Sequence, residues 1–288
     1  MADRPNNSPA SVRQRLLNIA REQGRVFDVV LVTFGLERLI YRLSISQHRD
    51  SFVLKGGMLI SLWTGDENRV TRDADFLGFG DASEDHLTSV FSQIMSEPAD
   101  DGLVYDVDRL TAEAIREEQQ YGGIRLRTVA HLGKTRIPIT VDIGFGDAMT
   151  LPNYAVEYPS LLDMPAAHIR AYPPATVVAE KFHAIVALGL ANSRMKDYYD
   201  LWAILNTLSI AAKDIDDAIR GTFERRETDV PVGAPAGLTR QFSVDPLKIQ
   251  QWAAYTASIG LEGLSLENAT ESIWTVLGPV CERLTRFA

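Results

Sequence analysis

The chain has 288 residues, of which 45% are hydrophobic and 23% are charged, so it belongs with folded globular proteins and not with disordered or low-complexity chains. Its net charge is −9, from 29 basic and 38 acidic residues, which excludes a protein that coats nucleic acid through a generally basic surface. Cys281 is the single cysteine, so no intrachain disulfide can form.

No targeting or membrane-spanning segment is expected. The first seven residues are polar and lack the apolar core of a signal peptide. The most apolar run covers residues 182–191, whereas a membrane span needs about 20 apolar residues. The sequence therefore predicts a cytoplasmic protein without a membrane partner.

The predicted elements divide the chain into a mixed part and a helical part. Apolar spacing predicts two helices within about the first 46 residues, one capped by Ser8 and one over residues 27–45. Strands are expected at 52–55, 73–79, 103–110, 123–132 and 136–145, with helices at 58–63 and 83–95, the latter capped by Ser83.

From residue 173 onward the pattern is helical, with helices expected at 176–190, 195–208, 211–225, 246–257 and 266–286 and a loop at 228–240. This arrangement predicts an α+β fold in which residues 1–172 form a mixed sheet with flanking helices. Residues 173–288 form a helical C-terminal region.

Three aspartates are the first candidates for chemistry. Asp73 and Asp75 alternate in a predicted strand, so both carboxylates would point to the same side of it. Two such charges are costly unless a cation lies between them, and carboxylate oxygens are the ligands that Mg²⁺ prefers. Asp142 interrupts an otherwise apolar strand and is the candidate third ligand, although Thr140 shares its parity and a solvent-facing position remains an alternative.

Gly56 and Gly57 precede a predicted helix. Glycines allow the backbone to approach a ligand closely, and a helix N-terminus offers free N–H groups to phosphate, although a tight turn explains the pair as well. In the helical region Lys181 could act in a site or lie on a solvated helix face. Asp197 could act in a site or simply be favoured in the first turn of its helix by the helix dipole. Asp200 could pair with Lys196 instead.

A local basic patch lies between residues 121 and 141, where no acidic residue occurs. Arg125 and Arg127 alternate on one strand face, and Lys134 and Arg136 follow. These four side chains are candidate contacts for RNA phosphates, the alternative being an ordinary solvated sheet face.

Taken in order, five motifs resemble the AbiEii/AbiGii abortive-infection toxin family, which includes the MenT toxins and has a nucleotidyltransferase fold of the DNA polymerase β superfamily. The resemblance covers roughly residues 30–210 and is carried by the segments Leu54-Lys-Gly-Gly57, Thr71-Arg-Asp-Ala-Asp-Phe76, Val141-Asp-Ile-Gly144, Glu180-Lys181 and Lys196-Asp-Tyr-Tyr-Asp200.

The resemblance implies a role for each matching residue. Gly56 and Gly57 match the turn that holds the nucleoside triphosphate, and Thr71 lies where many members have Ser or Thr near the nucleotide. Asp73 and Asp75 match the metal-binding pair, with Asp142 as the third carboxylate. Lys181 matches a phosphate-contacting lysine, and Asp197 matches the acidic residue of a Lys-Asp motif. Met58, where a small hydroxyl residue is common, and the 15-residue spacing over 58–72 depart from the pattern.

These residues imply a mechanism with two Mg²⁺ ions. One ion would activate an attacking hydroxyl with help from Asp142, and the other, with Lys181 and the glycine turn, would neutralise the leaving pyrophosphate. The resemblance implies an NTP as the nucleotide substrate, the 3′ end of tRNA as the acceptor and a protein antitoxin as a partner. Two alternatives remain: nucleotidyl transfer to a protein or small molecule, and a non-catalytic nucleotide-binding module.

Overall fold

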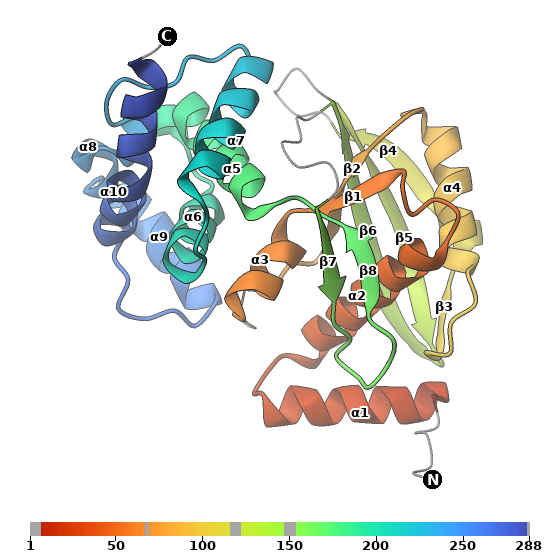
Figure 1. Ribbon diagram of the computed structural model, residues 1–288. Helices are drawn as coiled ribbons and strands as arrows, with labels where there is room; N and C mark the ends of the chain where they lie inside the picture. The colour runs from red at the N-terminus through yellow and green to blue at the C-terminus, as the bar shows by residue number, and fades with distance from the viewer. Residues whose placement is uncertain (1–6, 67–68, 116–121, 147–153, 287–288) are drawn as a thin grey trace. The chain divides into compact units, whose positions relative to one another are not determined.

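The computed structural model describes residues 7–66, 69–115, 122–146 and 154–286 (Figure 1). The fold is α+β, as predicted. The chain divides into two compact units. The first comprises Met1–Leu59, Val70–Gly146 and Asn153–Ala171, and the second comprises Ile60–Arg69, Asp147–Pro152 and Tyr172–Ala288.

A six-stranded mixed sheet organises the first unit. Its path is β1-β2-β6-β5-β3, and β4 also pairs with β5. The pairing of β2 with β6 is parallel, while the other pairings are antiparallel. The strands are β1 Phe52–Lys55, β2 Ala74–Gly78, β3 Leu103–Tyr105, β4 Thr111–Ile115, β5 Gly123–Leu132 and β6 Thr135–Phe145. A separate antiparallel pair joins β7 Ala155–Tyr158 to β8 Ala167–Arg170.

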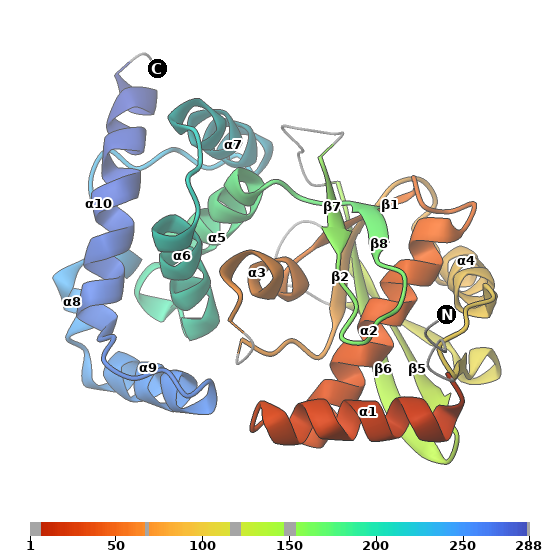
Figure 2. The same ribbon diagram turned by 60° about the horizontal axis from the view of Figure 1, so that its bottom comes forward.

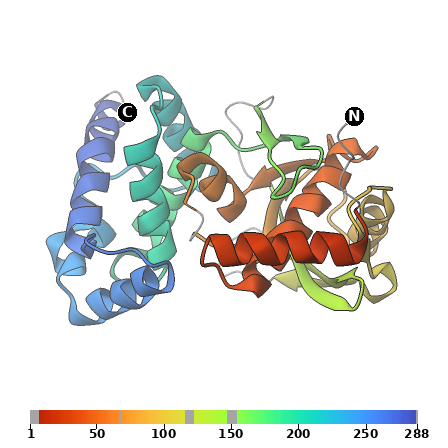
Figure 3. The same cartoon turned by 90° about the horizontal axis from the view of Figure 1, so that it is seen from below.

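Helices cover one face of the main sheet. Helix α2 (Phe27–Ile45) packs on β6, and α4 (Glu84–Ser96) packs on β3, β4 and α2, so the two lie on the same side (Figure 2). Helix α1 (Pro9–Glu22) packs on α2 and β5, and Figure 3 shows it from the side. Alternate strand residues such as Phe76, Val141 and Ile143 are buried on this side. The opposite face is left for the polar residues of the same strands.

The second unit is helical. A short helix, α3 (Gly57–Thr64), begins in the first unit and ends in the second. Helix α5 packs on both α6 and α7, and α10 packs on α6 and α7 as well. The helices are α5 Pro174–Leu188, α6 Met195–Thr207, α7 Ala212–Arg225, α8 Arg240–Ser243, α9 Pro246–Ser258 and α10 Leu266–Thr285.

Among the described residues, one segment, Pro174–Ala191, is long and apolar enough to cross a membrane by length and composition. Half of this segment is buried within the fold, and it includes helix α5. A buried core helix of a globular unit has the same composition, so the segment gives weak evidence for a membrane span.

The structure corrects several local expectations. The alternation at 103–110 forms only the short strand β3 before a 3-10 turn at Val107–Arg109. Ser8 and Ser83 occupy the N-cap positions of α1 and α4, but neither side chain makes a capping hydrogen bond. Strands β4, β7 and β8 were not expected, because each is short and carries few apolar residues in alternation.

A buried ion cluster ties α2 to the loop before β3. Asp101 is fully buried and accepts hydrogen bonds from Arg42 at 2.5 and 3.0 Å and from Arg38 at 3.2 Å. Its Oδ1 also accepts the backbone N–H of Leu103 at 3.0 Å. Because both arginines are buried too, the carboxylate is the charge that makes their burial tolerable.

The substitution Asp101→Asn keeps the shape of the side chain and removes the charge. We expect it to lower the free energy of unfolding by about 3–5 kcal/mol, because two buried guanidinium groups lose their counter-ion. Urea denaturation measures this loss. The control Asp50→Asn removes an exposed carboxylate near Arg49 and should cost less than about 1 kcal/mol. Equal losses for the two variants would contradict the assignment.

Candidate active site

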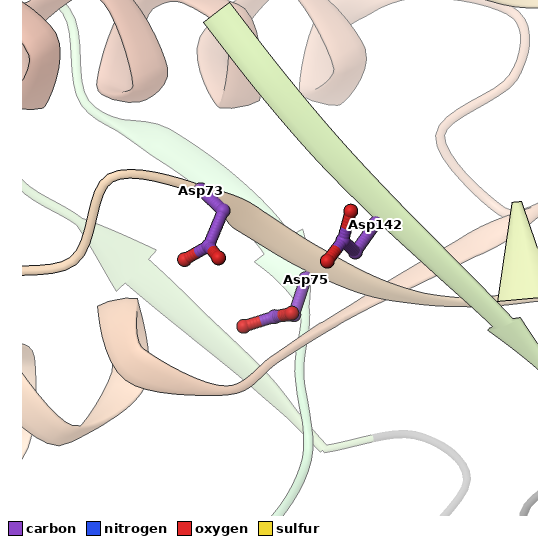
Figure 4. A group of neighbouring side chains, drawn as sticks. All are labelled: Asp73, Asp75 and Asp142. Atoms are coloured by element: carbon purple, nitrogen blue, oxygen red, sulfur yellow. The ribbon is translucent and has the colours of Figure 1, made fainter. Parts of the chain in front are cut away.

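Three carboxylates meet on the open face of the main sheet. Parallel pairing places Asp75 of β2 directly opposite Asp142 of β6, and Asp73 lies two residues before Asp75 on the same side. One ligand oxygen from each residue lies within 4.8 Å of the other two, and all three side chains are half-buried (Figure 4). This convergence agrees with the sequence-based grouping of the three residues. Like charges held this close favour a cation among them.

The backbone of Gly56 forms one wall beside Asp75. Gly56 has a φ of +72°, and a Cβ added there would lie 2.6 Å from the Asp75 Cγ and overlap its carboxylate. Gly57 then begins helix α3, whose first N–H groups have no partner within the helix. Gly56 is therefore required by the close approach of Asp75 as well as by the turn.

Thr71 anchors the first carboxylate. Its hydroxyl donates a hydrogen bond of 2.6 Å to Oδ1 of Asp73. Sequence reasoning placed Thr71 near the nucleotide. The structure gives it a contact within the carboxylate group, where it orients Asp73.

Arg125 lies next to the carboxylates, although the sequence analysis assigned it to the basic patch as a candidate RNA contact. Its Nε and Nη2 donate to the two oxygens of Asp142 at 2.7 and 2.5 Å, a bidentate pair. The hydrogen bond to Asp142 is the main reason that the pKa of Arg125 lies above its ordinary value. The sequence contained a signal for this pair, because a two-residue turn at Gly133-Lys134 sets residue 125 opposite residue 142.

The other members of the basic patch lie farther along the same hairpin. Arg127 forms an ion pair with Glu113 of β4. Lys134 and Arg136 are exposed at the turn between β5 and β6. The patch is thus a strip along one hairpin, with its two strand arginines paired to carboxylates.

Lys181 and Asp197 belong to a buried ion network in the second unit. The Nζ of Lys181 lies 2.7 Å from Asp197 and 2.8 Å from Asp200. Arg69 donates to both oxygens of Asp200 at 2.6 and 2.9 Å. The partners of Asp200 are therefore Lys181 and Arg69 and not Lys196, which sequence analysis had considered.

The charges in this network support one another. Asp197 and Asp200 are fully buried. Burial alone lowers the pKa of Lys181, but the attraction of the two aspartates outweighs burial and holds the pKa above its ordinary value. Burial would also raise the pKa of Asp200, but Lys181 and Arg69 hold it below its usual value. Lys181 is therefore a fixed cation at any physiological pH.

Substituting Gly56→Ala tests the contact with Asp75. We expect the added methyl group to displace the carboxylate and to weaken Mn²⁺ binding by about 10- to 100-fold, as measured by electron paramagnetic resonance. The positive φ adds a strain of about 1–2 kcal/mol, visible in urea denaturation.

Gly24→Ala is the matched control, because Gly24 has a φ of +64° and nothing lies within 4 Å of an added Cβ. That variant should show the strain without any loss of Mn²⁺ affinity. Unchanged Mn²⁺ affinity in Gly56→Ala would show that the glycine does not shape the site.

Comparison with known proteins identifies the family. The model of the family described as nucleotidyl transferase AbiEii toxin, type IV toxin–antitoxin system, matches residues 38–277. No curated protein matches the chain. Two crystal structures from Helicobacter pylori are similar to it over 88% of its length. One is described as a candidate nucleotidyltransferase (14% identity, 95% of that chain, TM-score 0.46). The other is JHP933 (15% identity, 92% of that chain, TM-score 0.48).

The family match extends over most of the chain and includes the three carboxylates, the glycine turn and the Lys181–Asp197 pair. The chain belongs to the AbiEii family of nucleotidyltransferase toxins of type IV toxin–antitoxin systems.

Proposed function

We propose that this nucleotidyltransferase is metal-dependent and transfers a nucleoside monophosphate from an NTP to RNA, with the 3′ end of tRNA as the acceptor. The observation that carries the proposal is the convergence of Asp73, Asp75 and Asp142 on the open face of the sheet. The acceptor hydroxyl would lose its proton to solvent and form a bond to the α-phosphorus. The bond between the α-phosphorus and the bridging oxygen would break, and pyrophosphate would leave.

The residues fit a divalent metal. Three carboxylates offer hard oxygen ligands within 4.8 Å of one another, and their half-burial leaves room for water and phosphate oxygens. Mg²⁺, in one or two ions, would neutralise the charge that develops on the phosphates. The protein's own contribution is to hold the three carboxylates in one place through β2, β6 and the Thr71 hydroxyl.

The remaining site residues act on the nucleotide in this proposal. The N–H groups at Gly57 and the start of α3 would bind phosphate oxygens, since a helix N-terminus favours anions. Lys181 would contact the triphosphate, and Asp197 would hold Lys181 in place. Arg69 and Asp200, which sequence analysis did not assign to the site, would support the same pair.

The basic strip supports a polynucleotide acceptor. Within β5, Arg127 lies about 17 Å from Leu132 at the usual rise of a strand, and the turn that carries Lys134 follows Leu132 directly. A strip of that length spans several phosphates, whereas a small-molecule acceptor needs only one contact. A cognate antitoxin as partner, which membership in a toxin–antitoxin family supports, and a cytoplasmic location complete the proposal.

Removal of Asp73 and Asp75 should abolish transfer. With Mg²⁺, an α-labelled NTP and total tRNA, we expect Asp73→Asn/Asp75→Asn to lose about a thousandfold or more of the transfer rate, because phosphate charge is no longer neutralised. The control Asp50→Asn/Asp85→Asn removes the same charge from exposed positions and should keep full activity. Equal activity in the two double variants would exclude a role for the carboxylates.

The acceptor is tested by blocking the RNA end. Label from the α-phosphate should enter tRNA, and label from the γ-phosphate should not. Oxidation of the 3′-terminal diol with periodate should prevent labelling. Labelling of oxidised tRNA would contradict transfer to the 3′ end. Label that enters a protein or small molecule instead would establish the first alternative, and nucleotide binding without any transfer would establish the second.

A further inference from the structure

The pairing of Arg125 with Asp142 occupies the third carboxylate of the proposed metal site. Both oxygens of Asp142 accept hydrogen bonds from one guanidinium group, at 2.7 and 2.5 Å. The same carboxylate supplies one of the three ligand oxygens that lie within 4.8 Å of one another. In the proposed site Asp142 would therefore contact two cations, the guanidinium group of Arg125 and the metal ion.

The fold gives this pair a fixed position. Arg125 and Asp142 lie directly opposite each other in the ladder of β5 and β6, and on the other side Asp142 faces Asp75 of β2. Arg125 therefore lies beside the three carboxylates on the β5 side, next to Asp142. On the opposite edge, Lys55 of β1 lies opposite Asp75.

The guanidinium lowers the repulsion among the three carboxylates. A bidentate arginine is the strongest single partner that a protein offers a carboxylate. Without a cation, Asp142 would be repelled by Asp73 and Asp75, so Arg125 holds it in place for binding. The same positive charge repels a divalent ion that approaches the shared ligand.

We propose that Arg125 is a resident counter-ion of the site: it holds Asp142 in the metal-free protein and competes with the metal for that carboxylate. The inference rests on the proposed function, because it takes the three carboxylates as the metal site. It makes Arg125 a positioning residue that tunes metal affinity, in place of the RNA contact expected from the sequence.

Competition and simple structural support predict opposite results when Arg125 is removed. If Arg125 only maintains the shape of the site, Arg125→Gln weakens metal binding. If it competes, the variant is less stable without metal and binds metal more tightly, since the repulsion of one full charge is lost. The increase in melting temperature on adding metal then becomes larger, because tighter binding stabilises the folded state more.

The test compares Arg125→Gln with Arg127→Gln in the full chain. Arg127 lies two residues away on the same strand and is paired with Glu113, so its removal gives the same change in net charge away from Asp142. At fixed ionic strength we expect Mn²⁺ to bind Arg125→Gln at least about tenfold more tightly than Arg127→Gln. Its melting temperature without metal should be the lower of the two, and its shift with Mn²⁺ the larger.

Equal or weaker Mn²⁺ binding by Arg125→Gln relative to Arg127→Gln would overturn the inference. Mn²⁺ binding by the wild-type protein and by Asp75→Asn shows whether the role of Arg125 or the metal site itself is wrong. Binding to the wild type that is lost in Asp75→Asn but unaltered in Arg125→Gln refutes only the role of Arg125, whereas an absence of Mn²⁺ binding by the wild type refutes the metal site itself. If Arg125→Gln does not fold, Arg125→Met replaces it, with Arg127→Met as its control. Methionine fills similar space without a positive charge, so Arg125→Met should also bind Mn²⁺ more tightly than Arg127→Met.

Discussion

The proposed active site depends on the register of one parallel strand pair. Asp75 lies opposite Asp142 because β2 and β6 pair with Ala74 opposite Val141 and with Phe76 opposite Ile143. Those neighbours are fully buried on the helix-covered face. A slip of one residue would expose them and turn Asp142 toward the core, so the apolar packing fixes the position of the carboxylates.

Holding three like charges together requires support from the surrounding chain, and each carboxylate has its own. Thr71 donates to Asp73, the turn at Gly56 leaves room for Asp75, and Arg125 pairs with Asp142. These three contacts come from different segments of the first unit. Each carboxylate is therefore positioned by a neighbouring group of the protein itself.

Much of the fold follows from periodicity in the sequence. The helix at 27–45 and the strands at 52–55 and 123–132 were predicted with the observed bounds. Apolar residues recur at helix spacing in the first, form a continuous buried run in the second and alternate in the third. Strands β7 and β8 were missed because their signal is weak: β7 has no buried residue, and the alternation in β8 is carried by Ala167 and Ile169 alone.

For the site, the type and spacing of the residues predicted the grouping of Asp73, Asp75 and Asp142, but not their contacts. Arg125 pairs with Asp142 because the number of residues in the turn at Gly133-Lys134 sets the register of the hairpin. Arg69 pairs with Asp200 because tertiary packing brings together residues that are 131 positions apart in the sequence. The first could have been worked out from the hairpin. The second could not, because no local pattern connects Arg69 to Asp200.

The two ion clusters illustrate why buried charge alone does not identify a site. In the second unit, Asp197 and Asp200 face cations from Lys181, Arg69 and Arg194, so each carboxylate is neutralised by the protein itself. In the first unit, carboxylates face one another across two strands. A matched network lowers the energy of the folded chain without a ligand, whereas converging like charges gain most when a cation binds. The arrangement of Asp73, Asp75 and Asp142 is thus the one that indicates a cation site, whereas the charges around Lys181 are matched within the second unit.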